Sequence, residues 1–497
     1  MKQTYKIALL VFACAGIFIL DSCKKTLNNL SEYNTNENQP LSASAGTLLS
    51  AAEFSGVMLD EGSFVGSGDG DGFLGIFAGQ FAGNHAEGIN YNGYQIKHGD
   101  FQFFFNDAYV SSLMNLKQLI TNALPDEKAY VGIAQILQAY QLGYLTTLYG
   151  DIPWSQALDV NKYPHPKYDA QVDIYTDVQN LLSSGIASIN AGAGESVTGD
   201  IIYNGNLDNW KAAAYLLKAR FYNHFSKKDP AGSATSALQM VDSAKLAGLT
   251  SDAGDFTLPY DGKQGATTNP WVGMYSNGML VANKTFLDTL IGNNDPRINA
   301  FFDSLPSPTF GTASVYGLGK VISENVGTGL YMIIGPSTSF GQATSPVLMA
   351  TYPELLMIEA EAALRSGNPS RAATAHNAGV IAHLNNLVTD PADMAKIPAY
   401  VAKYASETAA TITLGKIMTE KHKVMYSIEG ESWMDVRRMN YQYPSWLTIP
   451  VIDETVTPAV PVAASFIQRM IYPQSELDKN TANVPSSTIF DKLPILQ

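Results

Sequence analysis

Aromatic rings and amide side chains gather in the glycine-rich stretch 61–106 of this sequence. The rings lie among Asn, Gln and Gly residues, and they are Phe73, Phe77, Phe81, Tyr91, Tyr94, Phe101, Phe103, Phe104 and Phe105. A ring can pack against the apolar C–H face of a sugar, while amide groups satisfy the sugar hydroxyls. The stretch therefore predicts a surface that binds a saccharide.

The side chains expected to line that surface come from this stretch and from a later one. They are Tyr91, Tyr94, Phe101, Phe103, Trp271 and Tyr275. Binding surfaces are commonly built on loops that a rigid scaffold holds in place. An alternative stays open, in which half or more of these rings seal the loops against the scaffold and contact no ligand.

Two weaker signals lie in the same stretch. Asp69 and Asp71 could coordinate calcium through their carboxylates, but the full spacing of a calcium loop is absent, which favours a solvated turn. A formal GxGxxG pattern spans residues 70–75, but it follows a glycine-rich loop and no apolar strand precedes it. We therefore expect no nucleotide and no cofactor, and no metal beyond these weak calcium candidates.

Motifs of catalysis are missing from the sequence. HExxH, GxSxG and GxxxxGK followed by Ser or Thr do not occur. His376 and His383 are seven residues apart and could share a helix face, but no carboxylate stands at ligand spacing, so we expect packed or surface histidines. Nothing in the sequence demands catalysis, and we expect a binding protein that is not an enzyme.

The composition of the chain excludes several classes of binding partner and of fold. The chain has 497 residues, with 31 Lys and Arg against 45 Asp and Glu, and a net charge of −14. Such a chain cannot neutralise phosphates over an extended surface, which argues against nucleic acid and against electrostatic docking to anionic lipid.

Apolar residues make up 46% of the chain, enough for a buried core. The two cysteines, Cys14 and Cys23, exclude a disulfide framework and a multi-cysteine zinc module.

The amino terminus has the organisation of an export signal. Lys2 and Lys6 precede an apolar run over residues 7–20, which is long enough for a signal-peptide core and too short for a comfortable membrane span. The run ends in the sequence LDSC, which resembles a bacterial lipobox. In such a lipobox the chain is cut before the cysteine, here Cys23, which then carries a diacylglyceryl group and an acyl chain such as palmitate.

Acyl chains on Cys23 would hold a folded domain at a membrane, because each buried methylene contributes about 0.8 kcal/mol. We therefore expect a lipoprotein signal peptide over residues 1–22, a lipid-anchored tether over 23–40 and a single domain over 41–497. The alternative is a cleaved secretory peptide with an incidental cysteine.

Several long segments repeat their apolar residues at three and four positions, which is the spacing of an amphipathic helix. They are 130–148, 207–226 with 234–246, 354–365 with 371–387, and 413–428 with 433–439. Asp229-Pro230 and Gly367-Asn368-Pro369 break the second and third pairs. Helical hairpins stack because one hairpin cannot bury its own face. We predict a mainly helical fold of about four tetratricopeptide-like pairs, and an ordinary helical domain is the alternative.

Long stretches rich in Gly, Asn and Pro lie between these helices. They are 61–106, 151–168, 250–278, 292–350 and 440–497. Loops of this length are usually functional or disordered, and their aromatic content argues against disorder. We expect them to be ordered loops that form the ligand face.

Charged residues in the carboxy-terminal half are expected to serve the fold. Arginine can clamp a carboxylate in a bidentate pair, and we expect this of Arg437, Arg438 and Arg469. The candidate carboxylates are Glu361, Asp435 and Glu476.

Eight short motifs run in order along the chain. They are SEYNTNENQP at 31–40, YLTTLYGDIPWSQAL at 144–158, WKAAAYLLKAR at 210–220, NPW at 269–271, NDPRINAFF at 294–302, YPELLMIEAEAALRSGN at 352–368, EKHKVMYSIEGESWMDVRR at 420–438 and RMIYPQSELDKN at 469–480. In this order, behind a lipobox, they resemble the SusD/RagB-type nutrient-binding outer-membrane lipoproteins of Bacteroidetes-type bacteria, in particular the second SusD-like subgroup. Members often carry tryptophans in the region 73–109, where this chain has Phe and Tyr.

The resemblance implies one mostly helical domain, with four tetratricopeptide-like pairs behind a loop-rich ligand face. It implies a protein on the outer face of the outer membrane that catches an oligosaccharide or a peptide nutrient. It also implies a partner, a SusC-like TonB-dependent transporter, over which the protein acts as a lid and to which it delivers the nutrient.

Two other functions compete with this one. A lipid-anchored surface glycan hydrolase would need two buried acids that face each other across a groove. The binding lipoprotein of an ABC importer would need two lobes of alternating strands and helices, and the helical hairpins argue against it.

Overall fold

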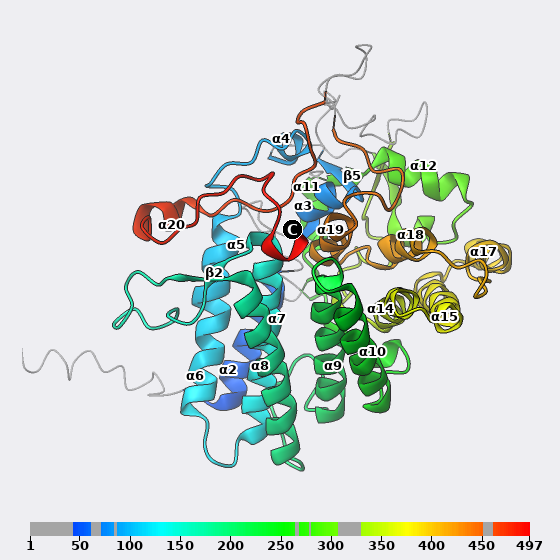
Figure 1. The fold of residues 1–497 in the computed structure, drawn as a ribbon. Coiled ribbons are helices and arrows are strands. Elements are labelled where there is room, and N and C mark those ends of the chain that lie inside the picture. Colours follow the sequence, from blue (N-terminus) through cyan, green and yellow to red (C-terminus); the bar gives the residue numbers. More distant parts are fainter. Residues whose placement is uncertain are drawn as a thin grey trace, which may run out of the picture. The chain divides into compact units, whose positions relative to one another are not determined.

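Helices make up most of the chain that the computed structural model describes (Figure 1). The described residues are 43–60, 71–83, 87–263, 268–277, 280–306, 330–450 and 461–497. Residues 45–497 fold as one unit. The expected signal peptide and tether lie outside the described residues.

Four helical hairpins form the main body of this unit. They are α7 (Lys128–Tyr149) with α8 (Gln171–Ala191), α9 (Leu207–Asn223) with α10 (Pro230–Leu246), α14 (Tyr352–Arg365) with α15 (Pro369–Leu387), and α18 (Leu414–Val424) with α19 (Glu429–Arg438). Figure 1 shows the first two hairpins side by side, with α14 next to α10. The prediction of a mainly helical fold of about four hairpins is confirmed.

The breaks predicted between helices are the caps of α10 and α15. Asp229 accepts a hydrogen bond from the backbone N–H of Gly232 at 3.0 Å, and Asn368 accepts one from Arg371 at 3.0 Å. Each cap is followed by a proline in the first turn, where an N–H would have no helical partner. Gly367 has a φ of +74°, in the left-handed region that glycine favours. The same residues therefore end one helix and start the next.

The first hairpin is held together by a close contact between two glycines. A Cβ atom at Gly132 would stand 2.7 Å from the carbonyl oxygen of Gly185, and one at Gly185 would stand 2.7 Å from Cγ1 of Ile136. Any side chain at either position would push α7 and α8 apart. In the third hairpin, Ala362 and Ala372 are fully buried and leave room for a similarly close approach.

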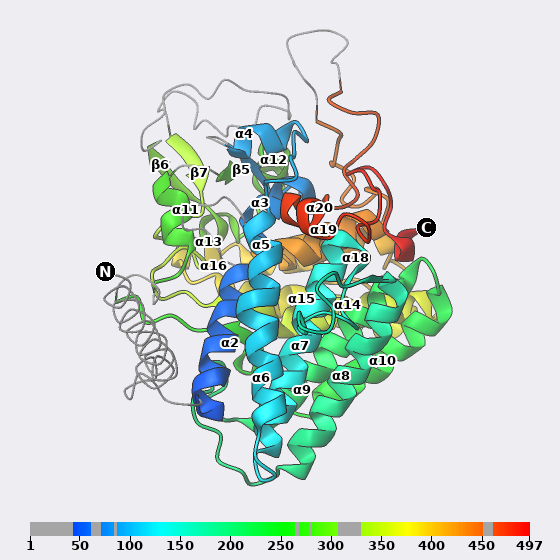
Figure 2. The ribbon, with the colours of Figure 1, turned by 90° about the vertical axis from the view of Figure 1, so that its left-hand side faces the viewer.

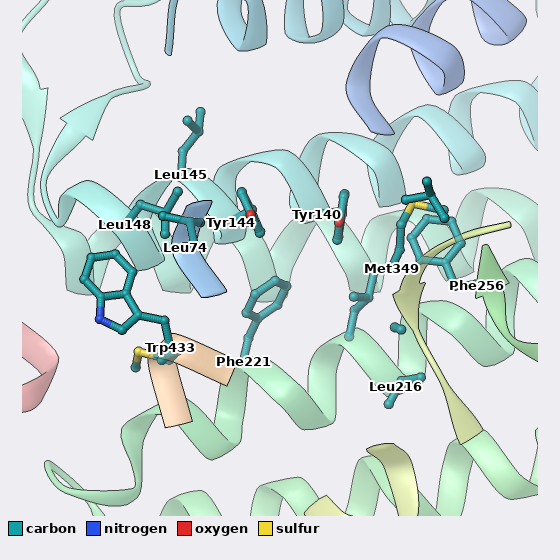
Figure 3. Close-up of a cluster of buried hydrophobic side chains, with 14 of the residues drawn as sticks. Leu74, Tyr140, Tyr144, Leu145, Leu148, Leu216, Phe221, Phe256, Met349 and Trp433 are labelled. Atoms are coloured by element: carbon teal, nitrogen blue, oxygen red, sulfur yellow. The ribbon is translucent and has the colours of Figure 1, made fainter. Parts of the chain in front are cut away.

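Aromatic side chains fill the space where the hairpins meet. Figure 3 shows Tyr140 and Tyr144 of α7 pointing toward Phe221 of α9, with Trp433 of α19 nearby. Tyr140 meets Phe256 edge-on, with ring centroids 5.6 Å apart. Pairs of this geometry contribute about 0.5–1.5 kcal/mol beyond the burial of their area. The core thus joins the first, second and fourth hairpins.

The stretch 61–106, predicted as a loop, forms regular elements in its described part. They are α3 (Asp71–Ala78), β1 (Phe81–Gly83), α4 (Glu87–Asn92) and the start of α5 (Gln102–Asp107). α3 packs against α19, which buries Phe77. A Cβ atom at Gly75 would stand 2.3 Å from the Phe81 ring, so glycine lets α3 and β1 pack closely. Gly72 and Gly75 of the GxGxxG pattern therefore lie inside a helix, not at a strand-to-helix turn.

The other stretches predicted as loops also contain helices or strands, which is a second correction. The remaining helices are α2 (Ala45–Asp60), the π-helix η1 (Ala108–Leu113), α6 (Met114–Asn122), α11 (Trp271–Asn277), α12 (Lys284–Gly292), α13 (Ile298–Phe301), α16 (Pro391–Met394), α17 (Ile397–Tyr404) and α20 (Gln474–Lys479), with 3₁₀ turns η2 (His224–Ser226), η3 (Asp252–Gly254) and η5 (Pro494–Leu496). Most of these elements are too short for a periodic pattern, and tertiary contacts order them.

No helix in the described ranges is long and apolar enough to cross a membrane.

The described strands pair as four antiparallel ribbons of two strands each. The pairs are β1 with β5 (Leu280–Ala282), β2 (Ile152–Pro153) with β3 (Tyr168–Asp169), β4 (Phe256–Leu258) with β8 (Val347–Ala350), and β6 (Asp303–Pro306) with β7 (Leu330–Ile333). Two-stranded ribbons do not form the α/β lobes that an ABC-importer binding protein needs. Figure 2 shows β5, β6 and β7 with α4, α11 and α12 at one end of the long helices.

Buried ion pairs connect the third hairpin to the fourth. Arg438 of α19 donates to both carboxylate oxygens of Glu361 in α14, and to Asp435 at 2.9 and 2.7 Å. Lys421 of α18 donates to Asp435 at 3.0 Å. All four side chains are buried. The prediction that Arg438 clamps Glu361 and Asp435 is confirmed.

The predicted carboxylate pairs of Arg437 and Arg469 are wrong for the described residues. The Arg437 guanidinium lies 3.9 Å from the ring centroid of Trp433, and Arg469 donates to the carbonyl of Tyr149. Glu476 accepts a hydrogen bond from a tyrosine hydroxyl at 2.9 Å. A ring face and backbone carbonyls hold these two guanidiniums, and sequence spacing gives no sign of such partners.

A second buried network joins α9 to α14 and α19. Arg220 donates to both oxygens of Glu354 at 2.6 Å each. His224 lies 2.8 Å from Glu431 through its Nε2 atom. The second, third and fourth hairpins are therefore linked by charge as well as by apolar packing.

Glu361→Gln should lower the free energy of unfolding by about 3–5 kcal/mol, because it leaves Arg438 buried without its main counter-charge. Urea unfolding followed by circular dichroism measures this change. The control is Asp208→Asn, which breaks an exposed pair with Lys211 at 2.8 Å and should cost about 1 kcal/mol at most. Equal losses in the two variants would contradict a structural role for the buried pair.

Stability should also fall in acid, and Glu431 contributes to this fall. Burial alone would raise the pKa of Glu431, but the neighbouring His224 and Arg220 outweigh burial and lower it from 4.5 to about 2. A carboxylate whose folded pKa is lowered stabilises the fold above its unfolded pKa, and this contribution is lost as the pH drops from 4.5 toward 2. In urea titrations across that range, Glu431→Gln should lose less unfolding free energy than the unmodified protein. Parallel pH profiles would refute this.

Candidate functional site

All four predicted site rings whose side chains are described are buried. Tyr91, Phe101, Trp271 and Tyr94 have exposed fractions of 1%, 6%, 5% and 8%. Tyr91 lies between two rings, with centroid distances of 5.2 Å to Phe73 and 5.3 Å to Phe101. Tyr91, Phe101 and Trp271 do not line the cleft described below. Their packing fits the alternative interpretation, in which such rings seal the ring-rich segment against the scaffold.

Other predicted positions fall where side chains are not described. Cys23 and Asp69 lie outside the described residues. Asp71, Phe103 and Tyr275 lie on α3, α5 and α11, but their side chains are outside the described part. Among the described residues, no group of three or more His, Cys, Asp or Glu is placed to hold a metal ion. Lipidation at Cys23 and the weak calcium candidates remain predictions.

The predicted residue Tyr94 reaches a cleft at the end of the molecule where the ribbons gather. Its ring is 8% exposed and packs against Phe77 and Phe490, with centroid distances of 6.2 and 6.4 Å. The cleft is lined by Ile76, Phe77, Gly79, Tyr94, Asn283, Thr285, Trp446, Leu447, Thr448, Pro450 and Phe466. This set combines rings with amide and hydroxyl groups, which is the combination that the sequence predicts for a sugar.

The ribbon of β1 and β5 brings two walls of the cleft together. Strand pairing sets Phe81 opposite Ala282, and the backbone N–H of Asn283 donates to the carbonyl of Gln80 at 3.0 Å. The Asn283 side chain then caps α12 by accepting from two backbone N–H groups at 3.0 and 3.2 Å. Gly79 has a φ of +76°, and its missing side chain leaves space for Leu447. Local backbone geometry thus fixes this end of the cleft.

Trp446 is the most informative residue of the cleft. Its ring stacks on Phe286, with centroids 6.3 Å apart and planes at 30°, and meets the edge of His422. Its indole Nε1–H is buried and has no hydrogen-bond partner in the described part of the chain. A buried donor without a partner costs about 1–3 kcal/mol. A ligand oxygen would remove that cost.

His422 supports the tryptophan and carries no charge at neutral pH. Burial lowers the pKa of His422 to about 4, so the ring is neutral. Its Nε2 atom donates to the carbonyl of Ala78 at 2.8 Å. The ring therefore holds Trp446 in place without adding charge to the cleft.

The opposite wall is held by the end of α19. Phe466 stacks face to face on Tyr441, with centroids 4.0 Å apart and planes at 2°. The Tyr441 hydroxyl accepts from the indole of Trp433 at 2.9 Å. Phe466 is thus connected to the core through two aromatic residues.

The described lining of the cleft contains no charged side chain. It therefore suits a neutral ligand and offers no carboxylate, thiol or cation for acid–base or nucleophilic chemistry. The cleft holds a volume of about 30 Å³, close to that of one water molecule. A sugar ring is larger than this volume, so only one edge or hydroxyl group of such a ring would fit inside.

Sequence reasoning missed Trp446, Phe466 and Asn283. The stretch 440–497 is expected to form part of the ligand face, but the residues singled out in it, Arg469 and Glu476, are assigned to the fold and not to ligand binding. One usable signal is present, because Trp446 lies in a short segment bounded by Pro444 and Pro450. Phe466 and Asn283 carry no signal of this kind, since tertiary pairing alone brings them to the cleft.

Comparison with protein families gives one match that covers most of the chain. The model SusD-like_2, described as "Starch-binding associating with outer membrane", matches residues 72–473. No curated protein sequence matches the chain.

Solved structures give the same picture at the level of the fold. A structure named as a chitin-binding protein has 23% identity and a TM-score of 0.68, and the match covers 88% of this chain and 95% of that one. A SusD/RagB family protein from Bacteroides thetaiotaomicron has 21% identity and a TM-score of 0.66, with coverage of 88% and 95%. A chitin-binding SusD homologue from Flavobacterium johnsoniae has 19% identity and a TM-score of 0.66, with coverage of 88% and 92%.

Tyr91→Ala should lower the free energy of unfolding by about 3–5 kcal/mol, the usual cost of removing a buried ring. Urea unfolding measures this loss. The control is Tyr163→Ala at a partly exposed ring, which should cost about 1 kcal/mol at most. A stable Tyr91→Ala protein would contradict the packing role of this ring.

Proposed function

This chain belongs to the SusD-like family, and on that premise we propose that it captures a neutral oligosaccharide at the cleft around Trp446. The captured sugar is handed to a SusC-like TonB-dependent transporter, over which the protein acts as a lid. The family is one of nutrient- and glycan-binding proteins of the outer membrane. The choice of ligand and the hand-over are our proposals.

The unpaired indole N–H of Trp446 is the observation that carries the proposal. A donor that is buried without a partner has lost its hydrogen bond to water. A ligand acceptor therefore recovers more free energy at such a donor than at one that water can reach. Sugar hydroxyl and carbonyl oxygens are such acceptors. The Tyr94 and Phe466 rings beside it offer apolar contact for C–H groups.

The uncharged lining supports a neutral ligand. Two structures of similar fold carry names that include chitin binding, and chitin is a neutral polymer whose acetamido groups provide carbonyl oxygens. An indole donor beside an asparagine suits such groups. We therefore take chitohexaose as the first probe and maltohexaose as the second, since the family description names starch.

The anchor and the location follow the same proposal. Cys23 would carry the lipid that holds the domain on the outer face of the outer membrane, and residues 24–40 would be the tether. Binding proceeds without turnover, since the described lining holds no pair of carboxylates of the kind that glycoside cleavage uses. A release of new reducing ends from chitohexaose by the purified protein would favour the hydrolase alternative.

Trp446→Phe should weaken binding of chitohexaose about 5- to 10-fold, because it keeps a ring but removes the donor. Trp446→Ala should weaken binding further, because it removes the ring as well. Isothermal titration calorimetry measures both affinities, with maltohexaose as the second ligand.

The matched control is Trp154→Phe, a partly buried tryptophan in a different loop. This variant should bind like the unmodified protein. Binding that stays unchanged in both Trp446 variants would remove the cleft as the ligand site.

A further inference from the structure

A second cavity lies between α15, α17 and α18, and its lining shares no residue with the cleft around Trp446. Figure 1 shows these three helices close together. The cavity has a volume of about 420 Å³, and we call it the hairpin groove. The lining residues that matter here are Lys403, Tyr404, Glu407, Lys416, Thr419 and Tyr443.

Two partly exposed tyrosine rings form apolar walls of the hairpin groove. Tyr404 packs on Tyr400, with centroids 4.6 Å apart, and its hydroxyl donates to Asn293 at 2.7 Å. Tyr443 lies against Gly415, where a Cβ atom would stand 2.9 Å from the ring. Both rings are thus fixed, and the Tyr443 ring can receive the C–H face of a sugar.

Polar groups of the groove can satisfy sugar hydroxyls. Thr419 and Ser445 bring hydroxyl groups to the lining. His376, also in the lining, donates from Nε2 to the carbonyl of Tyr404 at 3.0 Å. Its Nδ1 atom is buried without a hydrogen-bond partner in the described part of the chain. Burial lowers the pKa of His376, so the ring is neutral, and because it is fully buried it positions Tyr404 and does not reach a ligand.

Charge distinguishes the hairpin groove from the uncharged cleft. Lys416 pairs with Glu407 at 2.7 Å. Lys403 lies 4.7 Å from the Tyr404 ring centroid and has no carboxylate within 4.0 Å among the described residues. The buried Glu420 at the base is already paired with cations behind the groove, at 2.7 Å to Lys423. Among the charged residues described in the groove, Lys403 is therefore the one without a counter-charge, although the chain as a whole has a net charge of −14.

We propose that the hairpin groove is a second saccharide site, which takes a sugar that carries a carboxylate, such as a uronate. Tyr443 contacts the sugar face, Lys403 beside Tyr404 pairs with the carboxylate, and the hydroxyl groups of Thr419 and Ser445 bind the sugar hydroxyls. A charge-assisted pair of this kind is about twice as strong as a neutral hydrogen bond. The proposal rests in part on the proposed function, since it assumes that the protein binds saccharides.

The two sites share one segment of chain. Tyr443 and Ser445 line the hairpin groove, while Trp446 and Leu447 line the cleft. A ligand in one site that restricts the motion of residues 443–447 also restricts the residues of this segment that line the other site. Any effect of one ligand on the affinity of the other must then be reciprocal.

The test compares methyl β-D-glucuronide with methyl β-D-glucoside, which differ in the carboxylate. Titration calorimetry or saturation-transfer NMR should show the glucuronide binding about tenfold more tightly. Lys403→Gln should remove most of that difference. Glu407→Gln should strengthen glucuronide binding, because it frees Lys416 to act as a second cation.

The matched control is Lys162→Gln, because Lys162 stands beside Tyr163 as Lys403 stands beside Tyr404, with its ammonium 4.9 Å from the ring centroid. This variant should leave the glucuronide affinity unchanged. Equal affinity for the two glycosides, or a glucuronide affinity that neither Lys403→Gln nor Glu407→Gln changes, would overturn the proposal.

The test of the hairpin groove and the test of the cleft around Trp446 can succeed or fail independently. Chitohexaose binding that depends on Trp446 but not on Lys403 would support the cleft whatever the glucuronide result. A protein that binds glucuronide through Lys403 but binds no neutral oligosaccharide would support the hairpin groove and refute the proposed function.

Discussion

A charge that is buried must meet an opposite charge, and this constraint fixes the hairpins relative to one another. Glu354 and Glu361 of α14 are fully buried, and each is held by an arginine from a different hairpin, Arg220 and Arg438. Leaving any of these groups alone would cost several kcal/mol, so an arrangement that separates the hairpins is strongly disfavoured. Because α19 also packs against α3, the same pairs determine where the floor of the cleft lies.

Local signals predict the hairpins well. Apolar spacing identifies the long helices, and Asp229-Pro230 and Asn368-Pro369 are breaks in the sequence because they cap α10 and α15. α3 is missed because its glycines are poor helix formers, and its stability comes from packing against Phe81 and α19. Tertiary contact overrides local propensity in that segment.

The candidate site is harder to predict for the same reason. Sequence composition points to the end of the molecule where the cleft lies, since Tyr94 and Phe77 from the ring-rich segment line it. It cannot separate rings that face the cleft from rings that lie under it, because both kinds occur within a few residues. Trp446 reaches the cleft from 352 residues further along the chain than Tyr94, through contacts that no spacing rule records.

The separation of the buried rings from the lining of the cleft has an evolutionary consequence. Tyr91, Phe101 and Trp271 are packed into the core, and none of them lines the cleft. Exposed residues of the lining, such as Thr448, can then be exchanged without repacking the interior. The lining can in this way diverge quickly while the architecture stays the same.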